Sequence, residues 1–163
     1  MKKFELTSEF ITNIFGKKLF RVKALVEFGS VKAGELGGYI EKEENLSHNG
    51  NAWVSGDAKV SGNAWVYGDA WVSGNAEVSG NAKVYGDAEV SGNADYATIK
   101  GFGTEFRTTT FFKCKDGAVR VGCGCFYGDL EQFRNQVKDT RKGKIAEEYL
   151  MIADLMEKHF KEE

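Results

Sequence analysis

Histidine and cysteine are the residue types in this chain that could carry catalysis, and both are scarce. The chain has two histidines, His48 and His159, and His48 stands where a run of six-residue repeats begins. A histidine base must reach the hydroxyl or amine from which it takes a proton. In the spacing of the later repeats, His48 occupies the position of an inward valine. We therefore expect a capping or corner residue there, and a catalytic base only if the chain is an acyltransferase.

The three cysteines lie in the C-terminal half of the chain. Cys123 and Cys125 flank a glycine and should lie on one side of a strand, with Cys114 on the partner strand. The three sulfurs could approach one another, but a zinc site needs a fourth ligand, and this spacing is not C-x-x-C. We therefore expect a buried hairpin core, with no metal and no cofactor. P-loop, Rossmann and nucleophile-elbow motifs are also absent from the sequence.

Charge and hydropathy argue against several classes of partner. The formal net charge is −2, whereas nonspecific DNA binding needs a surplus of Lys and Arg that neutralises phosphates. No segment approaches the roughly 20 apolar residues of a membrane span. The odd number of cysteines and the polar start Met1-Lys2-Lys3 indicate a reduced protein without a secretion signal. We expect a cytoplasmic protein that binds neither membranes nor nucleic acid.

The elements that position these residues are set by a repeat in the middle of the chain. From Val54 to Asp95 the sequence consists of seven consecutive hexapeptides of the form Val-x-Gly-Asn/Asp-Ala-x. A fixed period is the signature of a repeat architecture. Valine favours strands, and its polar or variable neighbours place it inward. Gly-Asn and Gly-Asp tolerate left-handed backbone angles and should make corners, so that three units close a triangle.

This hexapeptide resembles the repeat of left-handed parallel β-helix proteins. The resemblance implies a triangular prism and, very often, a homotrimer. Many such proteins are acyl-coenzyme A-dependent acyltransferases, but the proline-containing segment of many of those enzymes has no counterpart in a chain without proline. We expect a mainly β protein in three parts. These are an N-terminal β cap at 1–39, a left-handed β-helix at 40–97, and a hairpin with two α-helices at 98–163.

Stacking the repeats three units apart groups the aromatic side chains. The outward aromatics fall on two adjacent faces of the prism, and they are Trp53, Trp65, Tyr67, Trp71 and Tyr85. A contiguous exposed apolar patch usually marks an interface. We therefore expect these residues to form the subunit interface of a trimer. The alternative is that a flank of the chain folds back over them.

The N-terminal flank shows the pattern of a hairpin. Phe10–Phe15 and Leu19–Phe28 are predicted strands on either side of a turn at Gly16. Ile40 and Leu46 are six residues apart, so an irregular first coil should begin there.

The C-terminal flank shows a second hairpin and then helices. Thr108–Lys115 and Ala118–Phe126 surround an Asp-Gly turn, which is a strong hairpin signal. Asp129, with Gln132 three residues on, is the signature of a helix N-cap. A final helix near 144–160 is predicted from apolar residues at helical spacing.

Over nearly its whole length the chain resembles uncharacterised proteins of bacteriophages and prophages. The segments that carry this resemblance are Lys32–Ile40, Asn45–His48, the repeats and Gly122–Phe133. The resemblance implies a small accessory protein, and such proteins often antagonise host defence. We expect a non-catalytic oligomeric binding protein, with an acyltransferase and a structural or assembly protein as alternatives.

A counter-defence protein of this kind would bind a host defence protein or sequester a nucleotide signal. A nucleotide would need cations, and the second hairpin region supplies them. The predicted ligand-binding residues are Arg107, Lys113, Lys115 and Arg120.

Overall fold

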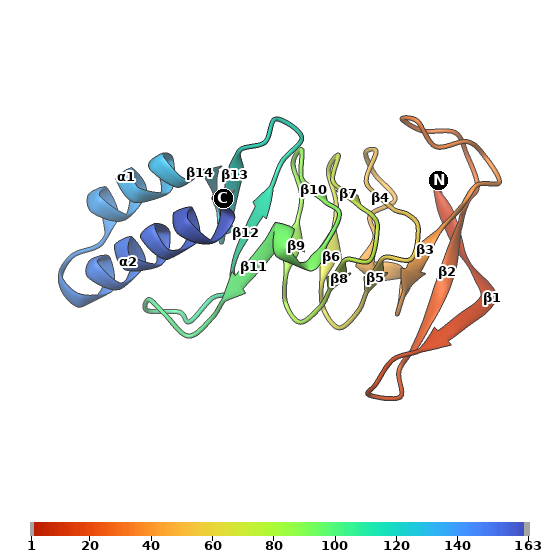
Figure 1. Ribbon diagram of the computed structural model, residues 1–163, viewed down its shortest axis with the longest axis horizontal. Coiled ribbons are helices and arrows are strands. Elements are labelled where there is room, and N and C mark those ends of the chain that lie inside the picture. Colours follow the sequence, from red (N-terminus) through yellow and green to blue (C-terminus); the bar gives the residue numbers. More distant parts are fainter. Residues whose placement is uncertain (1, 162–163) are drawn as a thin grey trace. The chain divides into compact units, whose positions relative to one another are not determined.

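The computed structural model describes residues 2–161 of the protein, which is mainly β with two α-helices (Figure 1). The chain divides into two compact units, Met1–Asn93 and Ala94–Glu163. Within the described residues, no helix is long and apolar enough to cross a bilayer. Two short 3-10 helices interrupt the strands, η1 (Glu43–Asn45) and η2 (Asn93–Asp95).

The N-terminal flank forms the predicted hairpin and adds a third strand. The strands are β1 (Phe4–Thr12), β2 (Lys18–Ala24) and β3 (Leu36–Ile40). The first strand begins before the predicted Phe10, because the fully buried Phe4 pairs with Ala24 at the far end of β2. β2 pairs antiparallel with both β1 and β3, and β3 then pairs in parallel with a strand of the repeats. The sheet order is β1-β2-β3-β5-β8.

Seven short strands follow, one in each hexapeptide. They are β4 (Trp53–Val54), β5 (Lys59–Val60), β6 (Trp65–Val66), β7 (Trp71–Val72), β8 (Glu77–Val78), β9 (Lys83–Val84) and β10 (Glu89–Val90). Strands three units apart pair in parallel, which gives the ladders β4-β7-β10, β5-β8 and β6-β9. These registers are the ones that the hexapeptide spacing predicts.

The interior of the repeats is made of valine and alanine. The residues that are at most 1% exposed include Val54, Val60, Val66, Val72, Val78, Val84, Val90, Ala58, Ala64, Ala70, Ala76, Ala82 and Ala88. Burying each valine contributes roughly 1.5–3 kcal/mol. The corner glycines have left-handed backbone angles, with φ of 61° at Gly56 and 68° at Gly68. The prediction of inward valines is confirmed, and the glycines lie in the turns between consecutive strands.

The first coil is irregular, and this corrects the predicted position of His48. Ile40 pairs with Val60, and Leu46 pairs with Val66. In the later ladders the paired residues are separated by three hexapeptides, whereas each of these two pairs has a longer separation. The extra residues lie between Leu46 and the first regular unit, and His48 belongs to this insertion. It does not fill the place of an inward valine.

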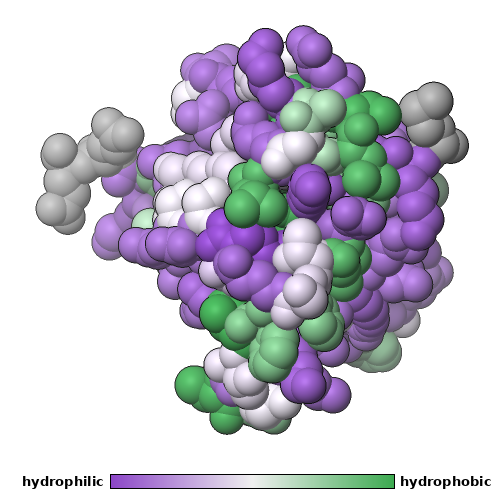
Figure 2. Space-filling view, turned by 90° about the vertical axis from the view of Figure 1, so that its right-hand side faces the viewer, coloured by the Kyte–Doolittle hydropathy of each residue, from purple (hydrophilic) through white to green (hydrophobic). Residues whose placement is uncertain are grey.

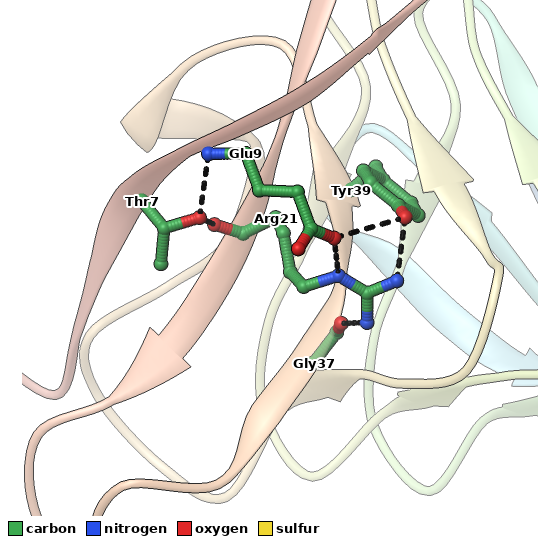
Figure 3. Close-up of polar contacts among 5 residues, drawn as sticks. All are labelled: Thr7, Glu9, Arg21, Gly37 and Tyr39. Carbon is green, nitrogen blue, oxygen red and sulfur yellow. Dashed lines mark hydrogen bonds and ion pairs between the residues drawn. The ribbon is translucent and has the colours of Figure 1, made fainter.

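Arg21 ties the hairpin to β3 through a polar cluster (Figure 3). Its guanidinium pairs with the Glu9 carboxylate and donates to the Gly37 carbonyl oxygen at 2.9 Å and to the Tyr39 hydroxyl. The guanidinium also lies over the Tyr39 ring, 4.5 Å from its centroid. The Thr7 hydroxyl donates to the Arg21 carbonyl oxygen at 2.8 Å. Because these contacts join β1, β2 and β3, the cluster serves to hold the three strands together.

The second unit contains a four-stranded antiparallel sheet. Its strands are β11 (Tyr96–Ile99), β12 (Thr109–Lys113), β13 (Val119–Cys123) and β14 (Phe126–Asp129), in that order. The predicted second hairpin is confirmed as β12 and β13, in which Phe111 pairs with Val121. The outer strands β11 and β14 were not predicted. One face of the sheet carries the fully buried Phe111 and Val121 into the core of this unit.

Two α-helices pack against that core and lie side by side in Figure 1. They are α1 (Leu130–Thr140) and α2 (Gly143–Phe160). The predicted N-cap is confirmed, since the Asp129 carboxylate accepts from the Gln132 backbone N–H at 2.7 Å. The predicted apolar face of the last helix is also confirmed, with Tyr149, Ile152, Ala153, Met156 and Phe160 buried.

Candidate binding site

Three aromatic rings form a continuous stack on the outside of the β6-β9 ladder. The rings of Trp65 and Tyr67 have centroids 3.9 Å apart, and those of Tyr67 and Tyr85 have centroids 4.6 Å apart. We call Trp65, Tyr67 and Tyr85 the aromatic column. It arises because outward positions flank each inward valine and because the same position recurs on the next coil. Partial burial raises the pKa of the Tyr67 hydroxyl.

An open groove of about 530 Å³ runs beside the aromatic column. Its lining residues are Glu43, Glu44, Leu46, Ser47, His48, Asn49, Asn63, Trp65 and Lys83. Trp65 is 40% exposed, so a large part of the indole is available to a partner. Lys83 lies beside Trp65 in register on the neighbouring strand. The groove therefore combines an exposed aromatic ring with amide and charged groups.

His48 lies on this groove, with its Nδ1 hydrogen-bonded within the protein and its Nε2 buried without a hydrogen-bond partner. Its Nδ1 accepts a hydrogen bond from the Lys3 backbone N–H at 3.0 Å, and its ring stacks on Phe4. The neutral ring must then carry its proton on Nε2, which lies 3.4 Å from a Glu43 carboxylate oxygen. A hydrogen bond from Lys2 holds the pKa of the Glu43 carboxyl below its usual value, with a smaller contribution from His48. This geometry suits a capping residue better than a general base.

Trp53 is not on the surface, which corrects the predicted aromatic patch. Its side chain is 0% exposed, and the Phe28 ring meets it edge-on with centroids 5.3 Å apart. Gly37 makes room for the indole, because a Cβ there would lie 2.7 Å from the ring. The N-terminal flank therefore covers Trp53, as the alternative interpretation expected. Trp71, its neighbour on the ladder, is half-buried.

The tip of the first hairpin is a second exposed apolar feature. Ile14 and Phe15 are 92% and 81% exposed, and a groove of about 370 Å³ separates this turn from Lys59 and Glu77. Figure 2 shows that apolar side chains on the N-terminal end lie in separate patches between hydrophilic ones. The tip lacks the continuous ring stacking of the aromatic column, so the column is the stronger candidate.

The four predicted ligand-binding cations do not converge. Lys113 pairs with Asp95 at 3.7 Å, and Arg120 pairs with Asp116 at 2.8 Å. The register of β12 and β13 places Lys113 and Arg120 on opposite faces of the sheet, because their positions in the ladder are adjacent. Lys115 is exposed at the hairpin turn. A single site built from all four is therefore excluded by the topology of the sheet.

Arg107 instead lines two neighbouring concavities within the second unit. Their volumes are about 220 and 130 Å³, and both are lined by Arg107, Cys123, Arg141 and Tyr149. Arg141 was not predicted as a site residue. The signal that could have found it is the basic run at 138–144, in which four cations accompany one carboxylate: Lys138, Arg141, Lys142 and Lys144 with Asp139.

The three cysteines do not form the predicted buried hairpin core, since Cys114 is buried, Cys123 is half-buried and Cys125 is exposed. Cys123 ends β13 and pairs with Phe126 across a tight turn that contains Cys125. Cys114 lies at the other end of the hairpin, where its backbone N–H donates to the Ala118 carbonyl oxygen at 2.9 Å. Across residues 2–161, no group of three or more His, Cys, Asp or Glu side chains is placed to hold a metal ion.

Comparison with known proteins adds no family assignment. No family model matches the chain, and no curated protein matches it. The geometry offers two binding features, the aromatic column in the first unit and the arginine-lined double pocket in the second.

Proposed function

We propose that this protein is a non-catalytic binding protein that works as a homotrimer. In this proposal the repeats form a left-handed parallel β-helix, and the aromatic column docks against a second copy of the chain. The observation that carries the proposal is the outward stack of Trp65, Tyr67 and Tyr85 on one ladder. Stacking of this kind stabilises each chain on its own, but the apolar surface that Trp65 still exposes is buried only if a second copy covers it.

The β-helix assignment is supported by the period of the pairing. Partners in each of three ladders are separated by three hexapeptides, the number of units expected to close one turn. Glycines with positive φ separate consecutive strands, as corners require. The left hand and the trimer come from the resemblance of the hexapeptide to the repeat of that fold.

The rigidity of the aromatic column supports an interface role. Binding costs less when the side chains at the interface are already ordered. Tyr67 and Tyr85 stack with their planes 3° apart, so each ring restricts the motion of the other. Aromatic residues are enriched at the centres of interfaces because they bury a large area with few rotatable bonds.

The environment of His48 favours binding over acyl transfer. The Nδ1 lone pair, which a base would use, accepts from the Lys3 backbone instead of facing the groove. For an acyltransferase, His48 would have to turn away from Phe4 and lose the stacking contact at 4.2 Å. The partner suggested by the resemblance to phage and prophage proteins is a host defence protein or a nucleotide signal. The protein would meet either in the host cytoplasm.

The experiment compares two variants. One removes residues of the aromatic column, and the other changes a residue outside it. Trp65→Ser with Tyr67→Ser removes two of the three rings, and sedimentation equilibrium should then show dissociation at concentrations where the parent chain is associated. Glu89→Ser changes an exposed position that precedes an inward valine on another ladder, so it should leave the association unchanged.

Two outcomes would count against the proposal. Equal association of the double variant and the parent chain, with circular dichroism unchanged, would remove the column from the interface. Turnover of acetyl-coenzyme A that is lost in His48→Ala would replace binding by acyl transfer.

A further inference from the structure

The double pocket of the second unit has the shape of a two-part ligand site. Separately, the volumes of about 220 and 130 Å³ fall below the usual range for a small-molecule site, which begins at roughly 300 Å³. Since Arg107, Cys123, Arg141 and Tyr149 line both concavities, one ligand could occupy the two together. Taken together, they reach the lower end of that range.

Two guanidinium groups give this double pocket its charge. Burial raises the pKa of the Tyr149 hydroxyl, whereas Arg141 and Arg107 lower it, so both cations lie close enough to the hydroxyl to act on it. Arg141 directly follows α1, within the basic run at 138–144. Arginine is the residue best suited to phosphate, because its planar fork can donate two parallel hydrogen bonds.

A carboxylate of the chain already marks where an anion would bind. The Arg107 guanidinium pairs with Glu105, and both side chains are about half exposed or more, at 49% and 64%. An exposed ion pair of this kind is weak, so a multiply charged phosphate can displace it. Glu105 thus occupies the position of the ligand's anionic group without closing the site.

The other part of the site is aromatic. Phe106 lines the smaller concavity, is 60% exposed, and has a φ of 54°, the left-handed value that a bulky residue rarely adopts. The loop is also held close to α2, because a Cβ on Gly103 would lie 2.6 Å from the Tyr149 hydroxyl oxygen. Backbone strain of this kind concentrates at binding sites, where the fold maintains it. Here it keeps an exposed ring next to two cations.

We propose that this double pocket binds a phosphorylated small molecule that carries a planar ring, as a nucleotide does. The phosphate binds Arg107 and Arg141 in place of Glu105, and the ring stacks on Phe106. This inference rests on the proposed binding function, and it gives that function a ligand class and a site. It does not depend on the aromatic column, which belongs to the other unit.

The test uses the full chain and the two thiols of the pocket as reporters. Cys123 and Cys125 line the larger concavity, whereas Cys114 is buried elsewhere and serves as an internal reference. The neutral reagent N-ethylmaleimide should label the pair several-fold more slowly in the presence of AMP. Adenosine and inorganic phosphate, which each supply one part of the ligand, should protect the pair more weakly than AMP.

Two arginine variants provide the matched comparison. Arg141→Met should weaken AMP binding at least tenfold by isothermal titration calorimetry. Arg120→Met removes an arginine that pairs with Asp116 and does not line either concavity, so it should change the affinity less than twofold. Circular dichroism checks that both variants remain folded.

Three results would overturn the inference. They are no protection by AMP at millimolar concentration, protection by inorganic phosphate equal to that by AMP, and equal losses in the two arginine variants. A monomeric chain that binds AMP as expected would contradict the proposed trimer and leave this site standing. A trimer that does not bind AMP would contradict this site and leave the proposed trimer standing.

Discussion

Tyr67 and Tyr85, which hold equivalent positions three hexapeptides apart in the chain, stack with their ring centroids 4.6 Å apart and their planes 3° apart. The stack exists because the repeat brings equivalent positions together on neighbouring strands of one ladder. Trp65 stacks on Tyr67 because the two side chains flank the inward Val66 of β6, so the column combines strand alternation with the repeat period. One regularity of the sequence therefore produces both the valine core and the proposed binding surface.

The corner glycines give the first prediction. Gly74 and Gly80 have similar positive φ values of 61° and 66°, but an added Cβ would lie 2.3 Å from the Ser91 carbonyl oxygen at Gly74 and would meet open space at Gly80. Gly80→Ala should cost about 1 kcal/mol from the backbone angle, and Gly74→Ala about 3 kcal/mol from angle and clash together. Urea unfolding measures both values. Equal costs would show that the coils at Gly74 can separate freely.

Lys3 gives a prediction about pH. Its side chain is 3% exposed, and its ammonium donates to the Ala52 carbonyl oxygen at 2.6 Å. Burial lowers the pKa of Lys3 to about 8, although Asp69 acts in the opposite direction. Between this value and the ordinary lysine pKa of about 10.4, the unfolded chain binds more protons than the folded chain, so stability rises with pH.

The expected size of this rise is about 2 kcal/mol between about pH 7 and about pH 9.5. The measurement is the free energy of unfolding in urea across that window. Lys3→Met should lack this component, whereas Lys2→Met, at an exposed position next in the chain, should keep it. A parent chain whose stability changes with pH no more than that of Lys3→Met would contradict the burial of the charged form.

Arg21 gives a prediction about the hairpin. Arg21→Met keeps the apolar stem but removes the contacts to Glu9, Gly37 and Tyr39. Because these are charge-assisted bonds at a partly buried group, the variant should lose about 2 kcal/mol of unfolding free energy. Lys23→Met on the same strand, which removes none of these contacts, should lose less than about 0.5 kcal/mol. Equal losses in the two variants would show that the contacts of the Arg21 guanidinium add nothing specific to the unfolding free energy.

The sequence predicts the repeats well because a period of six residues encodes two facts at once. The period predicts which side chains are buried and which strands are neighbours, as the pairing of Val54 with Val72 illustrates. The hairpin around the Asp-Gly turn and the cap at Asp129 were also predictable, since both depend on short local signals.

The features that were missed depend on contacts between distant segments. Trp53 is buried by two residues from the flank that has no repeat. Gly37 leaves space for the indole, and Phe28 packs against its edge. The insertion that displaces His48 falls before the first regular unit, where no period reveals it. Arg141, the C-cap of α1, lies near Arg107 only because the two helices pack on the sheet, and a run of basic residues by itself usually indicates solvated surface.

The most direct test of the central claim is the mass of the wild-type protein by native mass spectrometry at micromolar concentration. If the aromatic column is a subunit interface, the dominant species should have three times the 18.0 kDa mass of one chain. A dominant species of 18.0 kDa under the same conditions would contradict the claim, because the exposed Trp65 and the half-buried Tyr67 and Tyr85 would then not be packed against a second copy.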